Sequence, residues 1–245
     1  MTRLIALYTD FGIGSHYVGQ VHAVLAAARP GVPVVDLCHD APCWDPRRAA
    51  YLLPALVPVL PARALVMAVV DPGVGGERAG LILRQGERLL VGPDNGLFEL
   101  LLRRGGEAAV WRITQPPRPA PSRTFDGRDL FAPVVAALAG GVAPDRLGVP
   151  HAPRRQPDWP DDLAEIIHVD PYGNLATGLR AERLDPGRRL RAAGLSIAHA
   201  PTFAAVPRGQ PFWHANANGL VEIAVNQGRA DRLPGLAPGV PVVPE

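Results

Sequence analysis

The sequence predicts an α/β protein with two unequal domains: an N-terminal α/β/α layered domain with a mostly parallel sheet, and a smaller antiparallel β domain. Three observations support this prediction. Apolar runs alternate with helical patterns over the first 150 residues, a proline-rich segment follows, and the remaining chain holds short apolar runs separated by Gly, Pro and Asn. A chain of 245 residues is long enough for one large and one small core.

The N-terminal region alternates strands and helices. Short apolar runs predict strands at residues 4–8, 32–37, 64–70, 81–83 and 89–91. Apolar side chains at helical spacing predict helices at residues 17–28, 46–56, 95–103 and 129–139. Continuous apolar strands alternating with helices are typical of a parallel sheet that is covered on both faces.

A linker separates the two domains. Residues 150–162 hold four prolines, two arginines and three acidic residues with almost no apolar periodicity. We therefore expect domains at residues 1–150 and 163–245, joined by residues 151–162. Strands of the second domain are predicted at residues 166–169, 175–179, 190–197, 212–214, 220–225 and 240–243, which fits a small barrel or a sandwich.

Composition excludes several classes of protein. Hydrophobic residues make up 47% of the chain and charged residues 20%, which is ordinary for a folded protein. No apolar run approaches the ~20 residues that a membrane span requires, and no signal-peptide core follows Met1, so we expect a cytoplasmic protein that does not bind membranes. The net charge of +2 comes from scattered arginines, which argues against a nucleic-acid surface.

The two cysteines lie close to a histidine. Cys38 and Cys43 flank His39 and could form half of a metal site, but no second Cys/His pair follows at zinc spacing. The favoured interpretation is two reduced, partly buried thiols and no metal.

Two acidic residues follow predicted parallel strands. Asp10 and Asp71 stand at the carboxyl ends of their strands, where open α/β sheets bind ligands. A carboxylate there can accept hydrogen bonds from both hydroxyls of a ribose, so Asp10 suits a nucleoside. The alternative is that Asp10 only caps the next helix.

Asp71 opens a glycine-rich loop that ends at Arg78. Three glycines would let the backbone approach a ligand closely, but the loop lacks both the phosphate-loop ending and the dinucleotide-binding spacing. The turn could bring Arg78 back to Asp71 to form an ion pair. Such a pair could belong to a functional site, and the alternative is that it is purely structural. Polar segments at residues 124–129 and 170–174 are, taken singly, turns.

Together, these segments resemble the SAM (S-adenosylmethionine) hydroxide adenosyltransferase family, whose relatives are SAM-dependent fluorinases and chlorinases. The resemblance covers nearly the whole chain in order. It rests on Thr-Asp-Phe-Gly at 9–12, Val-Asp-Pro-Gly-Val-Gly at 70–75, Gly-Pro-Asp-Asn-Gly at 92–96, Thr-Phe-x-Gly-Arg-Asp at 124–129, Asp-x-Tyr-Gly-Asn at 170–174 and the final motif at 218–226.

The resemblance implies both a fold and an assembly. The second domain would be a β-barrel, and the chain would form a homotrimer with active sites between the N-terminal domain of one subunit and the C-terminal domain of the next. The implied reaction is hydrolysis of SAM at ribose C5′ to give adenosine and L-methionine. SAM would be the substrate, and no cofactor or metal would be required.

The resemblance also implies roles for individual residues in the N-terminal domain. Asp10 would bind the ribose hydroxyls, and Trp44 would line the pocket near C5′, with a buried core tryptophan as the alternative. Phe125 and Gly127 belong to the substrate-binding set. Around the attacking water, family members gather an Asp, an Arg and a His; these positions are Asp71, Arg78 and, in place of the histidine, Asp126.

In the C-terminal domain, Asp170 would hold the methionine ammonium group, Tyr172 would stack near adenine, and Asn174 would bind the adenine edge. Asn218 stands where the halogenases have an arginine that grips the methionine carboxylate. The chain also departs from the family pattern at Ala217, normally Ser, and at His16, commonly Asp.

Three hypotheses follow. A second acid at position 126 could serve as part of a base and proton relay, or it could disable the activation of water. The first hypothesis is a SAM hydrolase, in which two carboxylates repel halide ions and so favour water over chloride or fluoride. The second is a non-catalytic SAM or adenosine sensor. A nicotinamide-dependent enzyme is a remote third, because G-x-G-x-x-G is missing.

Overall fold

A computed structural model describes residues 4–116 and 122–245. The chain divides into two compact units between Gln156 and Pro157, a point inside the segment expected to be a linker. No helix in the described residues is long and apolar enough to cross a bilayer.

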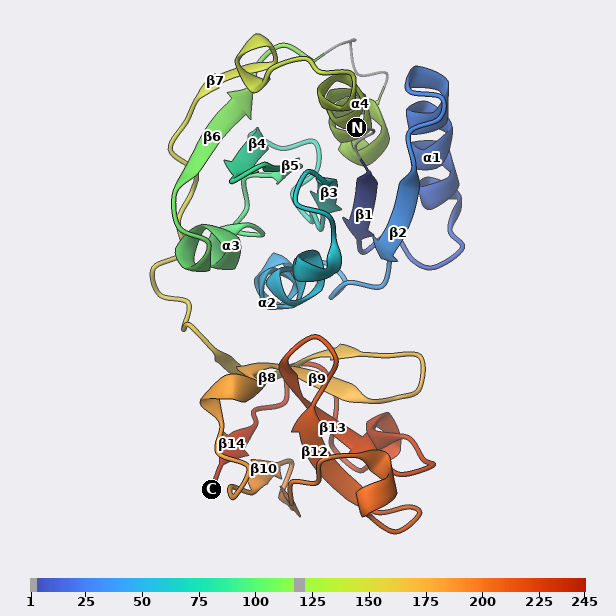
Figure 1. The fold of residues 1–245 in the computed structure, drawn as a ribbon, viewed down its shortest axis with the longest axis vertical. Helices are drawn as coiled ribbons and strands as arrows, with labels where there is room; N and C mark the ends of the chain where they lie inside the picture. Colours follow the sequence, from blue (N-terminus) through green and yellow to red (C-terminus); the bar gives the residue numbers. More distant parts are fainter. Residues whose placement is uncertain (1–3, 117–121) are drawn as a thin grey trace. The chain divides into compact units, whose positions relative to one another are not determined.

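The N-terminal unit is built on a seven-stranded mixed sheet (Figure 1). The strand order is β2-β1-β3-β5-β4-β6-β7. Strands β2, β1, β3 and β5 pair in parallel, whereas β5-β4, β4-β6 and β6-β7 pair antiparallel. The strands are β1 (Ile5–Thr9), β2 (Val34–Cys38), β3 (Leu65–Val69), β4 (Gly80–Gln85), β5 (Arg88–Pro93), β6 (Ala108–Ile113) and β7 (Gly148–Pro150).

The expectation of a mostly parallel sheet is therefore wrong for half of the strand pairings. The reason is the connection between β4 and β5, in which Gln85 pairs directly with Arg88. A turn of two residues can join only antiparallel strands, because parallel neighbours need a crossover of a dozen or more residues. Strands β6 and β7 were not predicted, and they extend the antiparallel edge.

Helices cover both faces of this sheet (Figure 1). Helices α1 and α4 pack together on one face, and α2 and α3 pack together on the other. Ser15 caps α1 by accepting a hydrogen bond from the Tyr17 amide, and Asp45 caps α2 in the same manner. The helices are α1 (His16–Ala28), α2 (Pro46–Leu56), α3 (Glu99–Arg104) and α4 (Ala132–Ala139).

Apolar side chains on both faces of the central strands pack against the helices that cover each face. Ile5 and Leu7 of β1 and Met67 of β3 pack in the cluster that includes α1 and α4. The next residue along β1, Tyr8, is fully buried, and its hydroxyl donates to the Ala49 carbonyl of α2 at 2.9 Å. Both faces are apolar because successive side chains of a strand point to opposite faces of the sheet.

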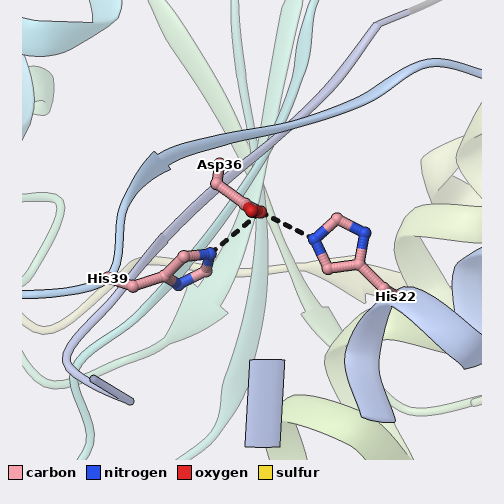
Figure 2. A group of neighbouring side chains, drawn as sticks. All are labelled: His22, Asp36 and His39. Carbon is pink, nitrogen blue, oxygen red and sulfur yellow. Dashed lines mark hydrogen bonds and ion pairs between the residues drawn. The ribbon is translucent and has the colours of Figure 1, made fainter. Parts of the chain in front are cut away.

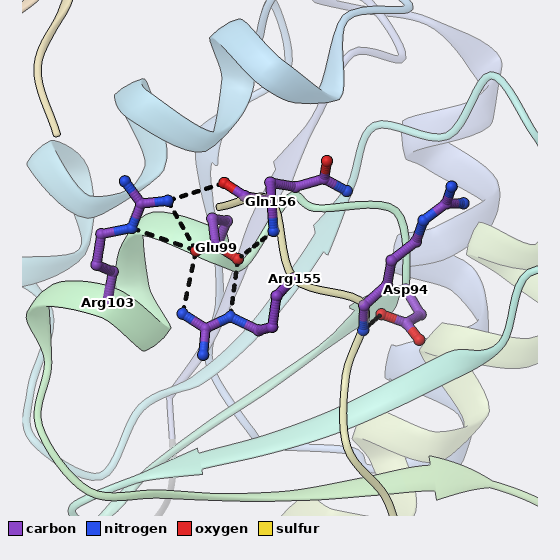
Figure 3. Close-up of polar contacts among 6 residues, drawn as sticks. Asp94, Glu99, Arg103, Arg155 and Gln156 are labelled. Carbon is purple, nitrogen blue, oxygen red and sulfur yellow. Dashed lines mark hydrogen bonds and ion pairs between the residues drawn. The ribbon is translucent and has the colours of Figure 1, made fainter. Parts of the chain in front are cut away.

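Buried Glu99 holds the segment that leaves this unit. Its carboxylate accepts hydrogen bonds from the guanidinium groups of Arg103 and Arg155 and from the Gln156 amide, at 2.9–3.3 Å (Figure 3). Burial opposes the charge of Glu99, but these hydrogen bonds outweigh it and lower the pKa of the carboxyl to about 2. Asp94 anchors the same segment by accepting from the Arg154 amide at 2.9 Å.

The C-terminal unit consists of two antiparallel sheets. The four-stranded sheet has the order β12-β13-β9-β8, and the three-stranded sheet has the order β11-β10-β14. Isolated bridges link Glu165 with Pro241 and His199 with Trp213. The strands are β8 (Leu163–Val169), β9 (Leu175–Arg180), β10 (Leu190–Ala192), β11 (Leu195–Ile197), β12 (Pro211–Ala215), β13 (Leu220–Val225) and β14 (Val243–Pro244).

One predicted strand in this unit is two strands. Residues 190–197 form a hairpin, in which Ala192 pairs with Leu195 across a turn at Ala193 and Gly194. Both turn residues adopt positive φ, as the tightest hairpins require. The short helical turns of the chain are η1 (Val57–Val59), η2 (Gly127–Phe131), η3 (Pro144–Arg146), η4 (Ala181–Arg183), η5 (Phe203–Ala205) and η6 (Ala230–Arg232).

Candidate active site

Two neighbouring parallel strands bring Asp10 and Asp71 to the same edge of the large sheet. Thr9 at the end of β1 pairs with Val69 at the end of β3, and each acidic residue follows its strand. A cavity of about 230 Å³ opens there. Its lining contains six of the predicted site residues; the full lining is Asp10, Phe11, Tyr17, Trp44, Val69, Asp71, Val74, Thr124, Phe125, Asp126 and Gly127.

Arg78 connects the two acidic residues of the predicted catalytic set. Its Nε donates to Asp71 Oδ2 at 2.8 Å, and its Nη2 donates both to the same oxygen and to Asp126 Oδ2. The side chains of Asp71, Arg78 and Asp126 are 4%, 13% and 17% exposed. The ion pair between residues 71 and 78 is therefore part of a three-residue cluster rather than an isolated pair.

One oxygen of this cluster remains available. Asp71 Oδ1 is buried and has no hydrogen-bond partner within the described residues, while Asp71 lines the cavity. A buried acceptor without a partner is costly, so such an atom in a cavity wall is a position for a donor molecule. Water or a substrate hydroxyl has the required O–H group.

Asp10 does not cap the following helix, since Ser15 occupies that position. Its Oδ2 instead accepts a hydrogen bond from the Trp44 amide at 3.0 Å. Burial raises the pKa of Asp10, and the nearby charge of Asp71 adds to this effect. The remaining acceptor capacity of this carboxylate faces a cavity, as ribose binding would require.

Trp44 is not a core residue. Its side chain is 77% exposed, and its backbone adopts φ of 55°, in the left-handed region that an aromatic residue rarely occupies. The hydrogen bond from its amide to Asp10 holds this conformation. Strained, exposed aromatic residues at a cavity wall are common at binding sites.

Gly75 and Gly127 allow the loops around the cavity to approach each other. A Cβ on Gly75, whose φ is +82°, would lie 2.6 Å from the Arg123 carbonyl oxygen. A Cβ on Gly127 would lie 2.7 Å from the ring of Phe11. Both positions therefore require glycine for steric reasons.

Sequence reasoning missed the aromatic wall of the cavity. The rings of Phe11 and Tyr17 pack edge-on against Phe125, at centroid distances of 5.5 and 5.0 Å. Phe11 lies inside the Thr-Asp-Phe-Gly segment, and Tyr17 stands in the first turn of α1, so proximity to that segment was the available signal.

The C-terminal unit has a cavity of its own, of about 570 Å³. It contains the other four predicted substrate-binding residues. Its lining is Asp170, Tyr172, Asn174, Phe203, His214, Asn216, Ala217, Asn218, Glu222, Val225, Gln227 and Gly228.

Asp170 and Asn174 are tied to each other in this cavity. Both carboxylate oxygens of Asp170 accept hydrogen bonds from Asn174, one from the backbone amide and one from Nδ2, each at 2.8 Å. One Nδ2 hydrogen is thus committed to Asp170, which leaves the second hydrogen and the side-chain carbonyl of Asn174 for a ligand. Tyr172 is 77% exposed, a position suited to stacking.

A buried carboxylate in the same cavity was not predicted. Glu222 pairs with His214 at 3.1 Å and accepts a hydrogen bond from Asn216 Nδ2 at 3.0 Å. It lies within the final family motif, where a charged residue inside an apolar strand was the signal. Asn218 is exposed, and its amide donates to Asn216 Oδ1.

The cysteines of the N-terminal unit are both free. Cys38 is half-buried and donates to Asp40 Oδ1 at 3.2 Å, and burial raises the pKa of this thiol to about 12. Cys43 is exposed, so the expectation of a partly buried thiol is wrong at that position.

The N-terminal unit is a layered α/β unit with an Asp-Arg-Asp cluster at its strand ends, and the C-terminal unit is an antiparallel β unit with a polar cavity. These features and the family matches define a class of proteins that transfer an adenosyl group. The chain belongs to the SAM hydroxide adenosyltransferase family. The model of its N-terminal domain matches residues 5–148, and the model of its C-terminal domain matches residues 164–243.

Individual relatives agree with this assignment. A protein named (R)-S-adenosyl-L-methionine hydrolase from Salinispora arenicola is 42% identical, over 97% of this chain and 96% of its own. A protein of the same name from Thermus thermophilus is 40% identical, over 98% of each chain. A fluorinase from Nocardia brasiliensis is more distant, at 23% identity over 91% of this chain and 90% of its own.

Solved structures share the fold. A conserved hypothetical protein from Thermus thermophilus superposes with a TM-score of 0.79 at 38% identity, covering 99% of this chain and all of the other. An uncharacterised conserved protein from Thermotoga maritima superposes with a TM-score of 0.87 at 28% identity, covering 98% of this chain and all of the other.

Proposed function

We propose that this protein hydrolyses SAM to adenosine and L-methionine, using water as the nucleophile at ribose C5′. The names of the relatives from Salinispora and Thermus support the reaction. The observation that carries the proposal is the unpartnered Oδ1 of Asp71 in the cavity wall, among the residues that the structure describes. That atom can accept a proton from an attacking water.

In the proposed reaction, the water oxygen forms a bond to C5′ and the C5′–sulfur bond breaks. The bonding electron pair moves to the sulfonium sulfur, which becomes the neutral thioether of methionine. One proton of the water goes to Asp71 Oδ1, and Asp10 holds the ribose so that oxygen, C5′ and sulfur lie in line. Because the sulfonium charge disappears in the transition state, a poorly hydrated pocket accelerates the reaction.

Arg78 orders the carboxylates in this mechanism. Burial disfavours its charge, but hydrogen bonds with Asp71 and Asp126 outweigh that effect and raise its pKa, so it stays cationic. Its contacts fix Oδ2 of Asp71 and leave Oδ1 without a hydrogen-bond partner in the described residues, while Asp71 lines the cavity. The cluster holds two acidic residues and one arginine, and this excess of acidic groups disfavours chloride or fluoride relative to water.

The complete SAM site would also use the C-terminal cavity. Asp170 would hold the methionine ammonium group, and Tyr172 and Asn174 would bind adenine. We propose a homotrimer in which the N-terminal unit of one copy and the C-terminal unit of the next form each site. The 77% exposure of both Trp44 and Tyr172 supports this arrangement, because it leaves both rings accessible to a ligand or to another copy of the chain. No cofactor would be needed.

We further propose that the two C-terminal sheets form a closed barrel. The Glu165–Pro241 bridge joins the β8 edge of one sheet to the segment before β14 of the other. The His199–Trp213 bridge joins the segment after β11 to β12. These two contacts link both pairs of sheet edges, and closure removes exposed edges.

The reaction is tested by incubating purified protein with SAM in H₂¹⁸O and analysing the products by liquid chromatography and mass spectrometry. We expect adenosine that carries ¹⁸O in its 5′-hydroxyl, together with unlabelled methionine, at a rate that chloride does not increase. Formation of 5′-chloroadenosine would contradict hydrolysis. Tight binding of SAM without product would favour the sensor hypothesis, to which the replacement of the family histidine by Asp126 gives specific support.

A further inference from the structure

We infer that His22, Asp36 and His39 bind a divalent transition-metal ion outside the proposed SAM cavity. His22 lies on α1, Asp36 on β2 and His39 directly after β2. Figure 2 shows the two imidazole rings directed at the Asp36 carboxylate from opposite sides. None of the three residues lines the cavity at the strand ends.

The potential ligand atoms already converge. His22 Nε2 lies 2.7 Å from Asp36 Oδ1, and His39 Nε2 lies 2.9 Å from the same oxygen. All three atoms lie within 4.8 Å of one another. An ion bound at about 2.0–2.2 Å from each ligand requires only a small outward movement of these side chains.

The contacts of His39 allow a metal-binding tautomer. Its side chain is 7% exposed, and Nδ1 lies 2.7 Å from the hydroxyl of buried Thr9. When Nδ1 donates its proton to Thr9, Nε2 keeps a lone pair directed at Asp36. Histidine ligands of metals are oriented in this way by a hydrogen bond on the other ring nitrogen.

His39 Nε2 makes no hydrogen bond within the described part of the chain. It lies 2.9 Å from Asp36 Oδ1 as an ion-pair contact, and the atom is buried without a hydrogen-bond partner. With the proton on Nδ1, Nε2 is an acceptor, and the carboxylate oxygen of Asp36, also an acceptor, cannot satisfy it. A bound cation would satisfy it.

The donor set identifies the class of ion. Two imidazole nitrogens and one carboxylate oxygen suit Zn²⁺ and similar transition metals, while Mg²⁺ and Ca²⁺ prefer oxygen ligands. His22 and Asp36 are 35% and 50% exposed, so water can complete the coordination sphere from the solvent side. Zinc with three protein ligands and one water is a common arrangement.

The site is connected to the proposed substrate pocket. The His39 carbonyl accepts a hydrogen bond from the Gly12 amide at 2.7 Å, and its ring contacts Thr9, the residue before Asp10. An ion would thus join α1 and β2 to the loop that carries Asp10. We expect it to stabilise this loop without taking part in the reaction.

The test is calorimetric titration of the EDTA-dialysed full-length protein with ZnCl₂, in parallel with titration of three variants. We expect one ion per chain for the wild type and for His16→Gln, a control on an exposed histidine of the same helix. His22→Gln and Asp36→Asn should each weaken binding by at least about 100-fold. Both substituted residues are partly exposed, so these variants should remain folded, as thermal melting will verify.

A second measurement uses Co²⁺ as a spectroscopic probe. Binding at this site should produce visible absorption bands of tetrahedral or five-coordinate cobalt that His22→Gln removes. Absence of binding, or equal affinity in His22→Gln, Asp36→Asn and wild type, would overturn the proposal and leave the cluster as an ion-pair network. Neither measurement depends on SAM turnover, so the result is independent of the proposed reaction.

Discussion

Arg78 donates two hydrogen bonds to a single oxygen of Asp71 and leaves the other oxygen of that carboxylate buried and unpaired in the described structure. A symmetric, bidentate ion pair would have engaged both oxygens and made the pair purely structural. The asymmetric contact separates a fixed oxygen from one that can accept a proton.

The first prediction concerns Asp71. Asp71→Asn keeps the volume of the side chain but greatly reduces its basicity, so we expect kcat to fall by about 10²–10⁴-fold with little change in the affinity for SAM. Single-turnover assays and equilibrium binding measure the two quantities separately. Asp145→Asn, at an exposed position on η3, is the matched control and should retain full activity. Unchanged kcat in Asp71→Asn would rule out the proposed base.

The second prediction concerns Asp126. Asp126→Asn preserves an acceptor for Arg78 but removes one negative charge beside the cavity. We expect chloride to inhibit the variant about tenfold more strongly than wild type, because one nearby unit charge is worth roughly 1–4 kcal/mol in a partly solvated site. Chloride titration of adenosine formation measures this change. Equal inhibition of both proteins would show that charge does not exclude halide.

The third prediction compares two substitutions of Trp44. Both Trp44→Gly and Trp44→Ala remove the ring and should weaken SAM binding to a similar extent. Glycine tolerates the φ of 55° whereas alanine does not, so Trp44→Gly should have a free energy of unfolding about 1 kcal/mol higher than Trp44→Ala. Urea denaturation measures the difference. Equal stability would mean that the loop relaxes when the ring is lost.

The fourth prediction concerns pH and Glu99. Its pKa is lowered on folding, so its contribution to stability is present above the pKa of the unfolded state, near 4.5, and is lost as the pH falls towards about 2. Glu99→Gln should lower the free energy of unfolding by about 3 kcal/mol at pH 7. The difference in free energy of unfolding between Glu99→Gln and wild type should become smaller below pH 4.

Denaturation curves at pH 7 and pH 3 check this prediction. Glu107→Gln, at an exposed position nearby, is the control and should match wild type at both values. If the difference in free energy of unfolding between Glu99→Gln and wild type does not change with pH, Glu99 stabilises the fold through packing rather than through its charge.

Much of the fold follows from local sequence patterns. Helix α2 covers the predicted residues 46–56, because Asp45 and Pro46 mark its start and an apolar face follows. Strand β6 of the antiparallel edge could not be predicted, because it is half-exposed along its length and therefore lacks a strong apolar period. The hairpin at residues 190–197 resembles one strand in the sequence, because Ala193 carries no turn signal of its own.

The candidate site was predictable to a similar degree. Asp10 and Asp71 could be placed together because parallel strands end at a common edge. The proximity of His22, Asp36 and His39 could not be predicted, because these residues come from a helix, a strand and a loop and have no metal-binding spacing in the sequence. The catalytic, binding and assembly roles assigned to individual residues remain predictions.

The sequence by itself determined the family, the order of the main elements and the chemical types of the site residues, because these depend on local patterns and ordered motifs. Only the tertiary structure decided which oxygen of Asp71 is unpaired, that Arg78 reaches Asp126 as well, and that Trp44 is exposed. Those properties depend on contacts between residues up to 48 positions apart, whose geometry is set by packing rather than by neighbours in the chain.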